Sequence, residues 1–229
     1  MRIVTVLLGL LVLPSFGNDS VNFDSSKPGT TPPYWSLTAT HAAVPPRWEV
    51  IRDPRAPTRQ NVLAQVSPAG GDSEYIYDRA LCADGDLSVK FKITGGKGDR
   101  TAGIVWRYQD ENNYYLLDFS ADENRIAIYR VQNGQIRPIP VSGSKSPLPG
   151  VKHEIHVNQW YVARVTFQGS KVRVSFGNRR LFDAVDNGIQ AQGKTGLWTK
   201  AGTIAEFDDY RVARKASFSR FELSRIFRR

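Results

Sequence analysis

Short segments of alternating apolar and polar residues recur along the chain from about residue 61, and Gly, Asn, Asp or Ser bounds most of them. Alternation with a period of two is typical of half-buried β-strands, and no long window has a helical period. The predicted strands span residues 61–66, 74–77, 87–93, 102–108, 114–119, 125–131, 135–139, 161–167, 171–176, 179–185, 194–199 and 204–212. This pattern predicts an all-β fold: a two-sheet antiparallel jelly-roll sandwich.

The segments between these strands contain turn residues. Residues 95–99, 110–113, 169–170 and 177–178 are rich in Gly, Asn and Asp, and Asn133-Gly134 is a strong signal for a two-residue hairpin. They favour hairpins over crossovers. Residues 137–152 contain four prolines and are predicted to overhang one sheet as a rim.

The region before residue 58 is dense in proline, which favours irregular covering segments over regular strands. Trp35 and Trp48 are its expected anchors on the core. Residues 18–33 are predicted to be a flexible linker, residues 34–213 the sandwich domain, and residues 214–229 a basic C-terminal tail.

The first 17 residues have the pattern of a secretory signal peptide. Arg2 precedes an apolar run over residues 3–13, and small residues precede a cleavage position near Gly17. The run is too short to anchor the chain in a membrane. The mature protein is therefore expected to be secreted or periplasmic.

The net charge of +9 is unevenly distributed. Residues 213–229 carry five of these charges and Arg2 carries one, which leaves +3 on residues 18–212. That is too little for the dense basic face of a nucleic-acid-binding protein, so we exclude this partner class. The tail has the spacing of a capping box at Ser219 and Glu222, and as a short helix it could dock to an anionic surface or a partner.

Several motifs resemble one known group of domains. The sequences AGIVWRYQD at 102–110, NNYY at 112–115, GKTGLWTKA at 193–201 and FDDYRV at 207–212 are similar to secreted bacterial domains of the concanavalin A-like lectin/glucanase superfamily. The nearer resemblance is to laminin G-like and 3-keto-disaccharide hydrolase-type jelly rolls, which are related to family 16 glycoside hydrolases. It covers about residues 34–213. It implies two curved sheets whose concave face, in many relatives, holds a carbohydrate.

The catalytic pattern of family 16 glycosidases, Glu-x-Asp-x-Glu on one strand, is absent. Glu206 and Asp208 come nearest to it and are the candidate acid or base if the protein is an enzyme. The other interpretation leaves Glu206 exposed, while Asp208 or Asp209 binds backbone groups or an arginine near a bulge.

Strand alternation places Arg107 on the same face as Gly103 and Val105, away from the main core. If Arg107 meets Asp118 and Tyr114 there, the three side chains form a polar, aromatic floor for sugar hydroxyls. The other interpretation is a cross-strand ion pair. Trp198 is the tryptophan best placed to stack under a sugar ring.

Metal sites are weakly indicated. Asp84 and Asp86 could supply oxygens to calcium, which is common in lectin-like jelly rolls, although a turn explains the same residues. His153 and His156 would point to opposite faces of an extended chain. Cys82 is the only cysteine, which excludes an intrachain disulfide and a multi-cysteine metal site. No cofactor is expected.

Three functions follow from these observations. The first is a carbohydrate-binding domain without catalysis, whose ligand lies on the concave face at Arg107, Tyr114, Asp118 and Trp198. The second is a glycoside-processing hydrolase or lyase of the 3-keto-disaccharide type. The third is a structural or protein-interaction module of the cell envelope.

Overall fold

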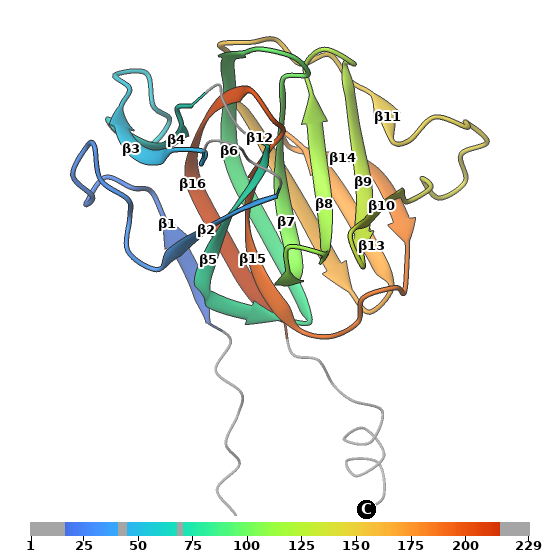
Figure 1. Cartoon of the computed structure of the whole chain (residues 1–229). Helices are drawn as coiled ribbons and strands as arrows, with labels where there is room; N and C mark the ends of the chain where they lie inside the picture. Colours follow the sequence, from blue (N-terminus) through green and yellow to red (C-terminus); the bar gives the residue numbers. More distant parts are fainter. Residues whose placement is uncertain (1–16, 41–44, 68–70, 216–229) are drawn as a thin grey trace, which may run out of the picture.

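The computed structural model describes residues 17–40, 45–67 and 71–215. These residues form sixteen strands and no helix, arranged in two antiparallel sheets that face each other (Figure 1). The predicted all-β jelly-roll sandwich is confirmed. The predicted signal peptide lies outside the described residues except for Gly17, and so does the tail except for its first two residues. Within the described part of the chain, no helix is long and apolar enough to cross a membrane.

We call the two sheets sheet A and sheet B. In order, sheet A contains β14 (Arg179–Val185), β13 (Lys171–Phe176), β12 (Tyr161–Gln168), β6 (Asp84–Gly96), β16 (Thr203–Lys215), β4 (Asn61–Gln65) and β3 (Trp48–Arg52), and β1 (Asn18–Val21) also pairs with β16. Sheet B contains β10 (Gln135–Pro138), β9 (Arg125–Gln132), β8 (Asn113–Ser120), β7 (Thr101–Asp110), β15 (Gly193–Thr199), β5 (Asp72–Cys82) and β2 (Trp35–Thr40), and β11 (Val151–Lys152) pairs with β9.

All twelve predicted strands are present, although β5 and β6 are longer than the alternation predicts. The hairpin at Asn133-Gly134 joins β9 to β10, and both residues have the positive φ that such a turn requires. The hairpin predicted at residues 95–99 is wrong, because β6, which ends at Gly96, lies in sheet A and β7 lies in sheet B. Turn residues show where a strand ends, but not which sheet holds the next one.

The prediction of a flexible linker over residues 18–33 is wrong. β1 pairs with β16 from Asn18 to Val21, and Phe23 is buried in the core. The irregular structure predicted before residue 58 is also interrupted by strands β2 and β3. Trp35 and Trp48 are buried as expected, each stacked on Tyr75. Apolar burial at these aromatic side chains outweighs the local effect of the prolines.

The core lies between the sheets and follows the predicted period of two. Leu87, Val89, Phe91 and Ile93 of β6 point inward, and Phe91 stacks on Phe119 of sheet B with ring centroids 4.4 Å apart. The outer faces of the two sheets differ. The outer face of sheet A is charged, whereas that of sheet B carries a second apolar cluster: Ile76, Val105, Tyr108, Tyr114, Leu116, Val131 and Trp198.

Candidate functional site

One cross-strand row on the outer face of sheet B crosses four strands, and three of them contribute a polar or aromatic side chain. The strand register pairs Glu74 of β5 with Trp198 of β15, Trp198 with Gly103 of β7, and Gly103 with Asp118 of β8. We call these four residues the outer row. Because directly paired residues project to the same face, the register alone places the two carboxyl groups on either side of the indole.

Glycine in the outer row makes room for the indole ring. A Cβ atom on Gly103 would lie 2.7 Å from Cδ1 of Leu116 and 3.3 Å from Cε3 of Trp198. The same Cβ would lie 2.8 Å from the backbone oxygen of Leu117, so a larger residue at position 103 would clash first with β8 and would also press on the ring of Trp198.

Tyrosine side chains complete the floor of this face. The hydroxyl of Tyr114 donates to Oε1 of Glu74 at 3.0 Å, which links β8 to β5 above the two strands between them. Tyr108 packs against Tyr114 with ring centroids 5.7 Å apart, and its hydroxyl is 3.2 Å from that of Thr38. The floor is thus aromatic at its centre and hydrogen-bonded at one edge.

Three buried polar atoms of the outer row have no hydrogen-bond partner in the described part of the chain. They are Oε2 of Glu74, Oδ1 of Asp118 and Nε1 of Trp198. A buried polar group without a partner costs about 1–3 kcal/mol, so such atoms are uncommon in folded proteins. Two acceptors and one donor in a single row therefore lack protein partners, and all three residues are buried, with Glu74 0% and Trp198 4% exposed.

Burial also changes the acidity of the two carboxyl groups. Loss of solvation raises the pKa of Glu74 to about 7, against a smaller opposite effect of the hydrogen bond from Tyr114. Loss of solvation likewise raises the pKa of Asp118 to about 7, and the positive charge of Arg125 opposes the change. Each group can therefore gain or lose a proton near neutral pH.

A cavity of about 550 Å³ lies beside the Asp118 end of the outer row. Arg125 and Tyr129 of β9 form one side, and Nη1 of Arg125 donates to the hydroxyl of Tyr129 at 2.6 Å. Residues Ser146, Leu148, Pro149 and Gly150 form the other side. This is the segment predicted to be a rim, and its loop projects from one side of the sheets in Figure 1.

The predicted floor of Arg107, Asp118 and Tyr114 is wrong for Arg107, whose side chain does not lie on this face. The pairing of β7 with β8 shifts between Trp106 and Asp110, and Arg107 has a φ of 48°. This bulge turns the side chain inward, where it is 2% exposed. Its guanidinium donates to three backbone carbonyls, those of Ala83 (2.8 Å), Gly169 (2.7 Å) and Ile189 (2.7 Å).

Glu206 and Asp208 lie on β16 in sheet A, whereas the outer row lies in sheet B. The expectation that Glu206 is exposed is wrong. Its side chain is half-buried and pairs with Nζ of Lys92 at 2.7 Å. Asp208 accepts hydrogen bonds from the backbone and hydroxyl of Thr58. Asp209 binds Arg211 beside the bulge of β16, as the sequence interpretation expected.

The turn predicted at Asp84 and Asp86 is wrong, because both residues begin strand β6. Asp84 accepts from the backbone of Gly169 at 2.8 Å, and Asp86 accepts from Arg164 and Thr166. No group of three or more His, Cys, Asp or Glu side chains is placed to hold a metal ion in the described ranges.

The sequence interpretation missed Glu74 and Tyr108. Glu74 alternates with Tyr75 and Tyr77 and shares a face with Ile76, which is a detectable signal for a carboxylate on the second face of a strand. Its link to Tyr114 depends on the strand order β5-β15-β7-β8, which local sequence does not contain.

A family model for the 3-keto-alpha-glucoside-1,2-lyase-like domain matches residues 28–213. The chain belongs to this family. Carbohydrate-binding module CBM66 from Bacillus subtilis is similar to this family member in structure, with 20% identity, a TM-score of 0.60, and coverage of 78% of this chain and 94% of the module.

Two further structures share the fold of this lyase-like domain. A Bacillus licheniformis β-glucanase is 12% identical, with a TM-score of 0.54 over 87% of this chain and 99% of the glucanase. Domain 4 of an extracellular arabinanase from Geobacillus stearothermophilus, in complex with arabinotriose, is 9% identical, with a TM-score of 0.52 over 84% and 87% of the two chains. The comparison with curated protein sequences gives no match.

Proposed function

We propose that the protein acts outside the cytoplasm and binds a carbohydrate along the outer row, on the outer face of sheet B. The observation that carries the proposal is the set of three unpartnered polar atoms on Glu74, Trp198 and Asp118. Once neighbouring side chains move aside to uncover these buried residues, a sugar ring could stack its C–H face on the indole while its hydroxyls bind the two carboxyl groups. The family membership and the arabinotriose bound by a domain of the same fold support this choice of ligand.

The spacing of the outer row favours binding over hydrolysis by a pair of carboxylates. Glu74 and Asp118 are three strands apart, which corresponds to about 14 Å between their backbones at the ordinary strand spacing. Glycosidases hold their two carboxyl groups about 5 Å apart when retaining and about 6.5–9.5 Å apart when inverting. The row instead suits contacts at the two ends of a ligand longer than one sugar ring.

We expect Trp198→Ala and Glu74→Gln each to weaken sugar binding at least tenfold. The test is a thermal-shift screen of residues 18–229 against sucrose, maltotriose, cellotriose and arabinotriose, with and without calcium, followed by calorimetry on any ligand that raises the unfolding midpoint. Glu111→Gln is the matched control, because it removes an exposed carboxylate near the same face. A folded protein that responds to no sugar would contradict the proposal and favour an interaction module of the cell envelope.

The protonation behaviour of Glu74 and Asp118 favours a second candidate, the lyase reaction named by the family. In such a 1,2-elimination, a carboxylate would take the proton from C2 beside the C3 carbonyl, and the electron pair would form the C1–C2 double bond. The glycosidic oxygen would leave C1 and gain a proton. This reaction needs one base rather than a close pair, and a pKa of about 7 suits that base.

If the domain is a lyase, Asp118→Asn or Glu74→Gln should reduce turnover of a 3-keto-α-glucoside at least a hundredfold, with a smaller effect on binding. Release of the alcohol from C1 gives the rate. The variants Glu206→Gln and Asp208→Asn serve as comparisons on the other sheet. Loss of turnover in these two, with Asp118→Asn unaffected, would assign the chemistry to sheet A instead.

A further inference from the structure

The outer face of sheet A carries a regular cross-strand row of arginine and serine. In strand order, the register pairs Arg180 with Ser175, Ser175 with Arg164, Arg164 with Ser88, Ser88 with Arg211, and Arg211 with Ser20. We call this the arginine row. Arginine thus occurs on every second strand, which corresponds to a spacing of about 10 Å between successive arginines.

Each arginine of this row is held in place but remains accessible. The side chains of Arg164, Arg180 and Arg211 are 57%, 62% and 62% exposed. One aspartate fixes each of them: Asp86 for Arg164 at 2.7 Å, Asp183 for Arg180 at 2.7 Å, and Asp209 for Arg211 at 2.8 Å. An oriented guanidinium loses less conformational entropy when it binds an oxyanion.

The face keeps an excess of positive charge after these pairings. Asp183 also binds Arg173, and Asp209 also binds Lys90. No ion pair forms at Lys171 or Lys215 in the described part of the chain. Around the arginine row, the seven cations Lys90, Arg164, Lys171, Arg173, Arg180, Arg211 and Lys215 lie with three carboxylates, Asp86, Asp183 and Asp209. A fourth carboxylate, Asp19, is paired with Arg214. The excess is confined to this part of the face, because farther along β6 and β16 Lys92 lies with Asp53, Glu206 and Asp208.

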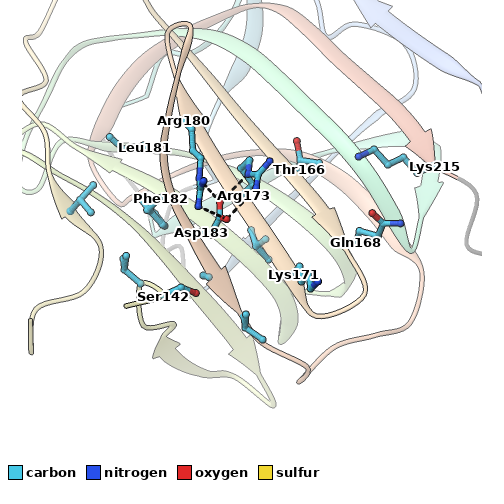
Figure 2. A pocket seen from close by; sticks show the side chains of 15 residues that line it. Ser142, Thr166, Gln168, Lys171, Arg173, Arg180, Leu181, Phe182, Asp183 and Lys215 are labelled. Carbon is cyan, nitrogen blue, oxygen red and sulfur yellow. Dashed lines mark hydrogen bonds and ion pairs between the residues drawn. The ribbon is translucent and has the colours of Figure 1, made fainter. Parts of the chain in front are cut away.

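Two hollows lie along the arginine row. The larger, of about 910 Å³, lies at the β14 end, where Figure 2 shows Arg180 and Arg173 converging on Asp183. Each of these arginines donates to Asp183 through Nε and Nη2, and its Nη1 has no partner among the residues that the structure describes. The smaller, of about 350 Å³, is lined by Arg164 and Arg211 together with Ser20 and Ser88, and also by Asp86 and Asp19, which are paired with Arg164 and Arg214.

We propose that the outer face of sheet A binds a linear anionic polysaccharide along the arginine row. Guanidinium groups bind carboxylate or sulfate oxygens in a planar geometry, and the serine hydroxyls between them can bind sugar hydroxyls. The arginines repeat at a regular spacing of about 10 Å, which suits a linear polymer that carries its charges at regular intervals. The hollows fit a chain better than a flat bilayer, and among the residues lining them Val185 is the one large apolar side chain that is exposed. This site is independent of the outer row on sheet B.

The test measures binding of oligogalacturonate, six to eight residues long, by calorimetry at low and high salt. The triple variant Arg164→Gln/Arg180→Gln/Arg211→Gln should weaken binding at least tenfold. Each aspartate keeps a second partner in this variant: Thr166 for Asp86, Arg173 for Asp183 and Lys90 for Asp209. The control Lys97→Gln/Arg137→Gln/Lys145→Gln removes the same charge from exposed positions off this face and should bind like the wild type. Trp198→Ala should also bind oligogalacturonate normally, whether or not the proposal for sheet B holds.

Four results would overturn the proposal. They are an equal loss in the control triple variant, unchanged binding in the arginine-row variant, loss of binding in Trp198→Ala, and binding to phosphatidylglycerol vesicles or inorganic sulfate without binding to oligogalacturonate. The first would show an effect of net charge alone, and the last would assign the arginines to a membrane surface or a free anion. Circular dichroism on each variant verifies that it is folded.

Discussion

Arg107→Met is expected to lower the free energy of unfolding by about 3–5 kcal/mol. The guanidinium is almost fully buried and joins three segments through the carbonyls of Ala83, Gly169 and Ile189, and it also pairs with Asp84. Methionine fills much of the same volume but donates no hydrogen bond, so these acceptors would lose a buried partner. Urea unfolding followed by tryptophan fluorescence measures the change.

Arg100→Met is the matched control for this experiment. Arg100 also binds a carboxylate, that of Asp122, but both side chains are partly exposed. Ion pairs at such positions contribute about 0–1 kcal/mol. If Arg107→Met cost no more than Arg100→Met, the bulge of β7 would not depend on the guanidinium, and our account of the Arg107 side chain would fail.

The protein is expected to become more stable as the pH falls from 8 to 5. Glu74 and Asp118 have pKa values of about 7 in the folded protein, against 4.5 and 3.8 in the unfolded chain. Between about pH 4 and 7 the folded state therefore holds protons that the unfolded state has lost, so its stability decreases as the pH rises through this window. The expected change is on the order of 2–3 kcal/mol for each group.

Thermal unfolding followed by circular dichroism over this pH range tests the expectation. The double variant Glu74→Gln/Asp118→Asn cannot lose these protons, so its midpoint should change much less between pH 5 and 8. Glu111→Gln should keep most of the wild-type dependence, because the charge of Glu111 is the smallest of the effects that raise the pKa of Glu74. A double variant with the wild-type pH dependence would show that other groups titrate in this window and that the outer row is better solvated than its burial indicates.

The fold could be predicted because strand alternation is a local signal. Residues such as Leu87, Val89, Phe91 and Ile93 repeat with period two, and burial follows this repeat directly. The strands before residue 58 were harder to predict, because proline is a local signal against strands. Phe23 and Trp35 are buried there by contacts with residues distant in the sequence, such as Trp35 with Tyr210.

The candidate site could be predicted only in part. Tyr114, Asp118 and Trp198 do lie on one outer face, as alternation within each strand indicates. Alternation failed at Arg107 because a bulge adds residues to one strand and reverses which side the next side chain faces. Strand alternation also could not predict the hydrogen bond between Tyr114 and Glu74, because this contact depends on the strand order, in which β15 and β7 lie between β5 and β8.

The sequence by itself determined that the chain forms about a dozen paired strands in two sheets, because hydrophobic periodicity and turn residues act over a few neighbouring positions. Only the tertiary structure decided which side chains meet. Strand order and register, together with the bulges at Arg107 and Asp209, gathered Glu74, Trp198 and Asp118 on one face and the arginine row on the other. These arrangements arise from burial and hydrogen bonding between strands far apart in the sequence, and a local pattern does not encode them.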